Sequence, residues 1–332
     1  MKKHLSLAFF MAATTFSGVT AQSKSLRFNE EGKFKIVQFT DLHYVINNEH
    51  SNQVVPECIK NVLETEKPDL VVFTGDLIYC SPADKALQTL FQPVIDRKIP
   101  YTVTWGNHDD EQNMNRTNLQ EYAEKQPYYM GKRNWDIPGA CNFVLPVSSN
   151  KNEKPASLIY CFDSHAYSGI EGVKGYDWIK PEQVNWYREN SRRYTQQNNS
   201  EPLPSVAFFH IPLPEYNMAA ADENAPLVGY RLEKACAPAL NTGMFTAMKE
   251  CGDVMGTFVG HDHDNDYATA WHGILLAYGR FSGGNTEYNH LPEGNGARVI
   301  VLTEGERTID TWIRLRTGEK VQPLNFPSGF RK

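Results

Sequence analysis

Residues 255–266 read MGTFVGHDHDND. An apolar run rich in β-forming residues reaches a glycine and is followed by five polar residues that can bind metals: His261, Asp262, His263, Asp264 and Asp266. Taken alone, this pattern is also typical of a solvated turn after a buried strand. Its interpretation depends on whether other strands of the chain end in the same way.

Short apolar runs alternate with helical patterns in the first third of the chain. Strands are predicted at 34–41, 69–76 and 101–109, with helices at 54–67 and 83–98 between them. Strands that alternate with helices in this way usually pair in parallel, in a sheet that helices cover on its faces.

The rest of the chain continues this α/β pattern, and no linker interrupts it. The predicted elements are a helix at 113–126, strands at 142–147 and 157–164, a helix at 181–197, a strand at 205–210, a loop at 214–240, a helix at 241–251, and strands at 273–279, 297–304 and 308–315. The simplest organisation is one α/β domain with two sheets over residues 22–332.

The charge of the chain argues against one class of partner. The 332 residues carry a formal net charge of −6, with a pI near 5.9 and no long basic run. Binding to a nucleic acid backbone requires a surface of lysine and arginine. A nucleic acid partner is therefore not expected, whereas the length permits a sizeable core.

The N-terminus has the layout of a secretory signal peptide. Two lysines precede an apolar stretch from Leu5 to Ala13, and small residues lead up to Ala21. The apolar stretch is too short to span a bilayer, and no later stretch is long enough to do so. We expect a cleaved signal peptide at 1–21 and a mature protein that is periplasmic or secreted.

The six cysteines are widely spaced and form no CxxC pair: Cys58, Cys80, Cys141, Cys161, Cys236 and Cys251. A zinc site built on thiolates is therefore not expected. Export would permit disulfides, although the sequence cannot choose among the possible pairings. The spacing favours buried small side chains, with one or two disulfides among them.

Five predicted strands end in residues that bind metals. The residues at these strand ends are Asp41 and His43, then Asp76, then Asn107 and His108, then His210, and finally His261 and His263. Each pattern alone is more typical of a capped turn or a hydrogen-bonded core residue. In parallel α/β sheets, however, ligands bind beyond the carboxyl ends of the strands. The five strand ends together therefore predict one metal site.

The ligand types at these strand ends indicate the metal. Imidazole, carboxylate and amide oxygen without thiolate suit Mn, Fe or Zn. There are more candidate ligands than one ion requires, and two-metal sites hold their ions about 3.5–4 Å apart to clamp both oxygens of a displacement. We therefore expect two metal ions.

The order of these motifs resembles that of the calcineurin-like metallophosphoesterases. The motifs are Asp41-Leu42-His43, Gly75-Asp76, Gly106-Asn107-His108-Asp109, His210 and Gly260-His261-Asp262-His263. The stretches HIPLPEY (210–216), GYDWI (175–179) and GHDHDND (260–266) look closest to a small purple-acid-phosphatase-like branch. The resemblance implies a four-layer αββα sandwich, in which helices flank two mixed β-sheets and the metals lie at the strand ends.

The resemblance also implies a division of the ligands. One ion would be held by Asp41, His43 and His263, and the other by Asn107, His210 and His261, with Asp76 bridging both. Purple acid phosphatases use a metal-binding tyrosine, and Tyr79 stands at that position in GDLIY. Tyr79 and His43 would compete for one coordination position, and the D-x-H form of the first motif favours His43.

The implied function is hydrolysis of phosphomonoesters, on a small molecule or a protein, by a hydroxide that the two metals activate. His108 would stabilise the transition state or protonate the leaving oxygen, and Asp109 would orient its imidazole. A solvated loop carboxylate is the alternative for Asp109. Arg280 would contact a phosphate or form a salt bridge.

Two other functions remain open on the same scaffold. A phosphodiesterase or nucleotide hydrolase would use the same metals and differ in the surrounding loops. A catalytically silent module that binds metal or phosphoprotein would be marked by loss of His108 or of a ligand. None of these residues is missing here.

Overall fold

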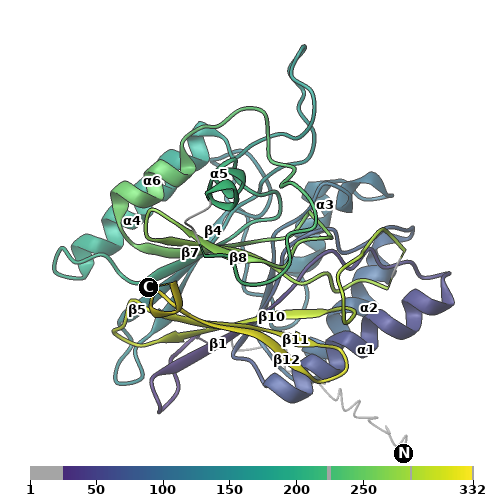
Figure 1. Cartoon of the computed structure of the whole chain (residues 1–332), viewed down its shortest axis with the longest axis horizontal. Helices are drawn as coiled ribbons and strands as arrows, with labels where there is room; N and C mark the ends of the chain where they lie inside the picture. The colour runs from purple at the N-terminus through teal and green to yellow at the C-terminus, as the bar shows by residue number, and fades with distance from the viewer. Residues whose placement is uncertain (1–24, 223–225, 285, 331–332) are drawn as a thin grey trace, which may run out of the picture.

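The computed structural model describes residues 25–222, 226–284 and 286–330. The expected signal peptide at 1–21 lies outside the described residues. Two six-stranded sheets face one another, and helices cover their outer sides (Figure 1). The predicted four-layer αββα arrangement of two mixed sheets is confirmed.

The first sheet has the strand order β12-β11-β10-β1-β2-β3. Its strands β1, β2 and β3 are parallel, whereas β10, β11 and β12 extend it in antiparallel fashion beyond β1. The bounds are β1 (Lys33–Phe39), β2 (Leu70–Phe73), β3 (Tyr101–Val103), β10 (Gly296–Thr303), β11 (Ile309–Leu315) and β12 (Lys320–Phe326).

The second sheet has the order β4-β5-β6-β7-β9-β8, and its four central strands are parallel. The bounds are β4 (Phe143–Ser148), β5 (Pro155–Cys161), β6 (Ser205–Phe208), β7 (Val254–Val259), β8 (Ala268–Trp271) and β9 (Ile274–Tyr278). The parallel strands β1, β2 and β3 of one sheet and β6 and β7 of the other are the five that the metal-binding motifs follow.

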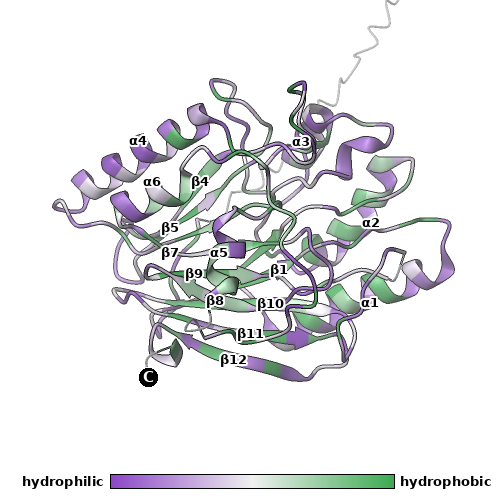
Figure 2. Ribbon diagram, turned by 45° about the horizontal axis from the view of Figure 1, so that its top comes forward, coloured by the Kyte–Doolittle hydropathy of each residue, from purple (hydrophilic) through white to green (hydrophobic). Residues whose placement is uncertain are grey.

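Helices form the two outer layers. The helices are α1 (Glu49–Glu66), α2 (Ala83–Asp96), α3 (Arg116–Glu124), α4 (Pro181–Gln197), α5 (Glu215–Ala221) and α6 (Met244–Cys251), with short 3₁₀ helices η1 (Asp109–Glu111) and η2 (Ser328–Phe330). Helix α1 packs against the first sheet, and α6 packs against β7 and α4 on the other side. In Figure 2 the strands are largely hydrophobic, whereas α4 carries mostly hydrophilic residues.

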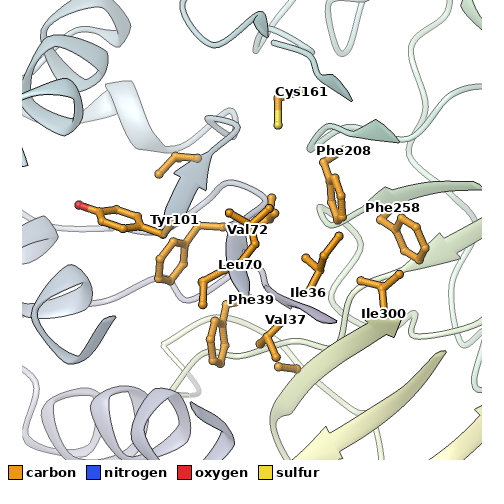
Figure 3. Close-up of a cluster of buried hydrophobic side chains, with 14 of the residues drawn as sticks. Ile36, Val37, Phe39, Leu70, Val72, Tyr101, Cys161, Phe208, Phe258 and Ile300 are labelled. Carbon is orange, nitrogen blue, oxygen red and sulfur yellow. The ribbon is translucent and has the colours of Figure 1, made fainter. Parts of the chain in front are cut away.

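Apolar side chains on alternate residues of the strands fill the space between the two sheets. Ile36 and Ile300 of the first sheet lie near Phe208 and Phe258 of the second, whose rings stack with centroids 5.2 Å apart (Figure 3). The neighbouring residue Val37 points to the opposite side of its sheet (Figure 3). Successive residues of a strand point to opposite faces of its sheet, and in β1 and β2 the residues on both faces are largely buried.

Several elements differ from the predictions in extent. Helix α1 begins at Glu49 rather than 54, because the side chain of Asn48 caps it by accepting the Ser51 N–H at 2.9 Å. Helix α5 lies inside the segment predicted as a loop. Strands β8 and β12 were not predicted, because both are sheet edges with weak hydrophobic patterns.

Two expectations about the whole chain have different outcomes. The prediction of one or two disulfides is wrong, because all six cysteines are free thiols. Three of them are fully buried. No helix in the described part of the chain is long and apolar enough to cross a membrane.

A buried carboxylate ties α1 to the first sheet. Glu66 accepts hydrogen bonds from Arg314 Nε at 2.6 Å, Trp312 Nε1 at 2.9 Å and Lys35 Nζ at 3.1 Å. Its side chain is 3% exposed. Removal of this group would leave the partly buried Arg314 without its partner.

We therefore expect Glu66→Ala to lower the free energy of unfolding by about 3 kcal/mol, the range seen when one partner of a buried ion pair is removed. Urea unfolding measures the change. The matched control is Glu64→Ala on the exposed side of the same helix, which should change stability by less than about 0.5 kcal/mol. Equal effects of the two variants would contradict this account.

Candidate metal centre

The loops after β1 and β2 are joined backbone to backbone. The Asp41 N–H donates to Gly75 O and the His43 N–H to Asp76 O, each at 3.0 Å. Asp41, His43 and Asp76 all have positive φ, at 52°, 41° and 51°, and His261 has φ 81°. Such conformations are unfavourable for residues with a side chain and concentrate at functional sites.

These loops bring six of the predicted ligands into two groups that share one residue. Potential ligand atoms within each group all lie within 4.8 Å of one another. One group is Asp41, His43, Asp76 and His263, and the other is Asp76, His210 and His261, all of them buried. A residue common to both groups has the position required of a bridging ligand.

The two oxygens of the Asp76 carboxylate have different partners. Its Oδ1 accepts the backbone N–H of His108 at 2.8 Å. Its Oδ2 lies 3.1 Å from Nε2 of His210 and 3.6 Å from Nε2 of His43. One oxygen therefore fixes the carboxylate, and the other lies between the two groups of histidines.

Backbone carbonyls orient two of the imidazoles. Nδ1 of His210 donates to Thr74 O at 2.7 Å, and Nδ1 of His263 donates to Tyr288 O at 3.0 Å. With the Nδ1 proton used in this way, Nε2 presents a lone pair to the site in the neutral ring. Metal-binding histidines are usually held by the same arrangement.

Asn107 also fits a cation. Its side-chain Nδ2 donates to the Tyr167 hydroxyl at 3.3 Å, so the amide is oriented. Its Oδ1 is buried and has no hydrogen-bond partner, and the same holds for Nε2 of His261. Buried acceptors are rarely left without a partner, since this costs about 1–3 kcal/mol each. Both atoms suit a metal ion.

The buried charge of Asp76 and the burial of the histidines shift the histidine pKa values in opposite directions. Burial lowers the pKa of His43 to about 3 and that of His263 to about 4. Burial also acts to lower the pKa of His210, but the charge of Asp76 outweighs it and raises that pKa to about 9. The same negative charge of Asp76 that raises the pKa of His210 would also attract a metal cation.

His108 is held by a different carboxylate from the one predicted. Its Nδ1 lies 2.7 Å from Oε2 of Glu111, one turn later in η1. Burial opposes protonation of His108, but Asp76 and Glu111 together raise its pKa above the usual value. Glu111 was not predicted, although its spacing of three residues from His108, typical of a helical turn, could have indicated it.

Asp109 neither orients His108 nor lies in solvent. Its buried carboxylate accepts the backbone N–H groups of Leu77 and Gly106 at 2.7 Å and of Asp76 at 3.0 Å. These three bonds hold the carboxylate inside the protein, away from the ring of His108. Asp109 thus joins the loops that follow β2 and β3. The prediction that Asp109 orients the imidazole of His108 is wrong.

Other predicted residues fall outside the cluster. Tyr79 is 39% exposed, and its ring lies edge-on to the His43 ring, with centroids 5.7 Å apart. His43, in contrast, is fully buried among the ligand atoms. Arg280 is buried and forms a salt bridge with Asp266, so it is not free to contact a phosphate.

The comparisons with known proteins agree with this geometry. The sequence model of the calcineurin-like phosphoesterases matches residues 34–265. The chain belongs to this family. That match covers the strand ends from Asp41 to His263, so the phosphoesterase motifs predicted from the sequence and the family model coincide.

The relatives of this phosphoesterase carry differing labels. It is 34% identical to the probable inactive purple acid phosphatase 29 of Arabidopsis thaliana, with 89% of this chain and 86% of the relative covered. It is 35% identical to the phosphatase DCR2 of Saccharomyces cerevisiae, with 91% of this chain and 57% of the relative covered. A dimetal phosphatase from Danio rerio shares the fold, with a TM-score of 0.61, 14% identity, and 90% and 99% of the two chains covered.

Glycines allow the loops to approach the ligands closely. A Cβ on Gly106 would lie 2.1 Å from Oδ1 of Asp76 and 2.3 Å from its backbone nitrogen. A Cβ on Gly260 would lie 1.9 Å from Oγ1 of Thr40 and 2.6 Å from Oδ2 of Asp41. Both positions therefore require glycine if the carboxylates are to stay in place.

We expect Gly106→Ala to displace Asp76 and to weaken metal binding by at least about tenfold, the lower range for disturbed ligand support. Elemental analysis of the purified, folded variant measures the loss. Gly169→Ala is the control, since a Cβ there meets nothing within 4 Å. Full metal content in Gly106→Ala would contradict the proposed place of Asp76.

Proposed function

We propose that this phosphoesterase hydrolyses phosphomonoesters at a centre of two metal ions. The observation that carries the proposal is the position of Asp76, whose Oδ2 lies 3.1 Å from His210 and 3.6 Å from His43. A buried carboxylate between two sets of imidazoles is suited to two cations. Phosphate monoesters are the substrates that most need such charge, because their uncatalysed hydrolysis is extremely slow.

The ligands divide into two sets under this proposal. Asp41, His43 and His263 would hold one ion, and Asn107, His210 and His261 would hold the other, with Asp76 shared between them. The absence of thiolate ligands favours Fe, Mn or Zn. When bound, two such ions activate water and neutralise the phosphate oxygens.

The chain's own residues then handle orientation and protons. His108 stabilises the transition state or donates a proton to the leaving oxygen. Glu111 accepts the Nδ1 proton of His108 at 2.7 Å and thereby fixes the ring. Asp109 acts indirectly. It accepts the backbone N–H groups of Asp76 and Gly106 and so holds the loops that carry Asp76 and the Asn107-His108 segment.

We further propose that the protein is exported. The lysines and apolar stretch of residues 1–21 support removal of a signal peptide, which leaves residues 22–332 as one phosphoesterase domain in the periplasm or outside the cell.

A catalytically silent module is the main alternative, because relatives carry the label probable inactive. Against it, this chain has all seven candidate ligands and His108. A phosphodiesterase would use the same ligands, and the site geometry does not favour it over a monoesterase.

Asp76→Asn tests the two-metal proposal. The loss of the shared charge should reduce the metal content from about two ions to one or none and reduce activity on phenyl phosphate to background. Elemental analysis and phosphate release measure both on one sample, and bis(p-nitrophenyl) phosphate tests diester cleavage. Faster cleavage of the diester than of the monoester by the wild type would refute the monoesterase assignment.

His108→Ala separates proton handling from metal binding. Activity should fall by about 10²–10⁴-fold, the usual contribution of general acid–base catalysis, with unchanged metal content. Glu111→Gln keeps the His108 imidazole but weakens the hydrogen bonds that orient it, and its activity should fall by about 10-fold. If His108→Ala kept wild-type kcat, His108 would have no role in the reaction.

A further inference from the structure

Tyrosines surround the candidate metal centre. Tyr288 stacks on His263 with centroids 4.5 Å apart and planes at 24°, and the ring of Tyr176 lies edge-on to His261 at 4.3 Å. Tyr167 stacks on Tyr176 at 5.7 Å, and Tyr79 lies edge-on to His108 at 5.6 Å. We call these four residues the tyrosine rim.

The exposure of the rim is unusual within this chain. All sixteen tyrosines lie in the described residues, and the three most exposed are Tyr79, Tyr167 and Tyr288, at 39%, 49% and 45%. They come from three separate loops, after β2, β5 and β9. The gathering of every exposed tyrosine at one site therefore does not follow from local sequence. Exposed aromatic rings placed together in this way mark a binding surface.

The charge around the rim is negative. The hydroxyl of Tyr167 donates to Glu111 at 3.1 Å, and that of Tyr288 donates to Glu233 at 3.2 Å. Of the cation–ring contacts in the described residues, none involves a rim tyrosine. Two arginines of this region are already paired, the partly buried Arg116 with Asp163 and the buried Arg280 with Asp266.

An aromatic rim with fixed carboxylates suits one kind of leaving group. A planar ring can stack on exposed tyrosines. A leaving group that carries further phosphates would be repelled by the carboxylates of Glu111 and Glu233. The rim therefore discriminates between phosphate esters by what lies beyond the phosphorus atom.

We propose that the site prefers phosphate monoesters of phenols, such as a phosphorylated tyrosine side chain, and that Tyr167 and Tyr288 determine this preference by stacking on the aryl ring. This inference rests on the proposed phosphomonoesterase function. Tyr79 and Tyr176 complete the wall beside His108 and His261.

A pair of non-hydrolysable ligands tests the preference without any turnover. Phenylphosphonate and methylphosphonate carry the same anionic group and differ in the ring. Calorimetry on the full chain, with the metals it carries when purified, should give about tenfold tighter binding of phenylphosphonate. Tyr167→Ala and Tyr288→Ala should each reduce this ratio by about three- to fivefold, whereas the Phe variants, which keep the ring, should retain it.

The controls isolate the rim from the metals. Tyr288→Ala keeps the backbone carbonyl that accepts the His263 proton, so its metal content and methylphosphonate affinity should stay near wild type. Trp135→Ala removes a 69% exposed aromatic residue that is not part of the rim and should change neither ligand.

The outcomes separate the two proposals. An unchanged phenyl-to-methyl ratio in both Ala variants, or equal affinities in the wild type, would overturn the role of the rim. Absence of phosphate release from phenyl phosphate, together with the expected binding ratios, would overturn the hydrolytic function and leave the binding preference standing.

Discussion

The burial of one carboxylate between two groups of imidazoles is the constraint on which the rest of the structure depends. Asp76 is 1% exposed, and only one of its oxygens receives a hydrogen bond from the backbone. An isolated charge in such a place costs several kcal/mol. The described contacts give Asp76 no arginine or lysine. Of the histidines around it, burial keeps His43 and His263 neutral, whereas the charge of Asp76 itself raises the pKa of His210. Without a cation, the buried charge of Asp76 would destabilise the fold. Bound metal ions would offset this cost.

The loops around Asp76 hold this arrangement in place against unfavourable backbone geometry. Four candidate ligands have positive φ, each at a cost of roughly 1–3 kcal/mol. Strain of that size persists only where the surroundings over-determine it. Here the surroundings are two buried sheets whose strand ends are tied together, with Asp109 clamping the loops after β2 and β3 and the His261 N–H bonded to Asp41 at 3.0 Å.

The sequence predicted most of this because the fold places strand ends together whatever the loops contain. Buried parallel strands give continuous apolar runs, and each run was followed by its ligands. The edge strands β8 and β12 were not predicted, because partly exposed edge strands lack continuous apolar runs. The role of Asp109 was wrong for a related reason. Adjacent residues on a turn point in different directions, so the neighbour of His108 faces the backbone while Glu111, three residues on, faces its ring.

A single hydrogen-bonded path joins the candidate ligand, the proton-handling residue and the rim. Asn107 donates to the Tyr167 hydroxyl, which donates to Glu111, which accepts from His108. Tyr167 therefore orients the Asn107 amide through its hydroxyl and offers its ring to the substrate side. The two roles use different parts of one side chain. Replacement by phenylalanine removes only the first, and replacement by alanine removes both, so the path and the rim are physically separable although they share a residue.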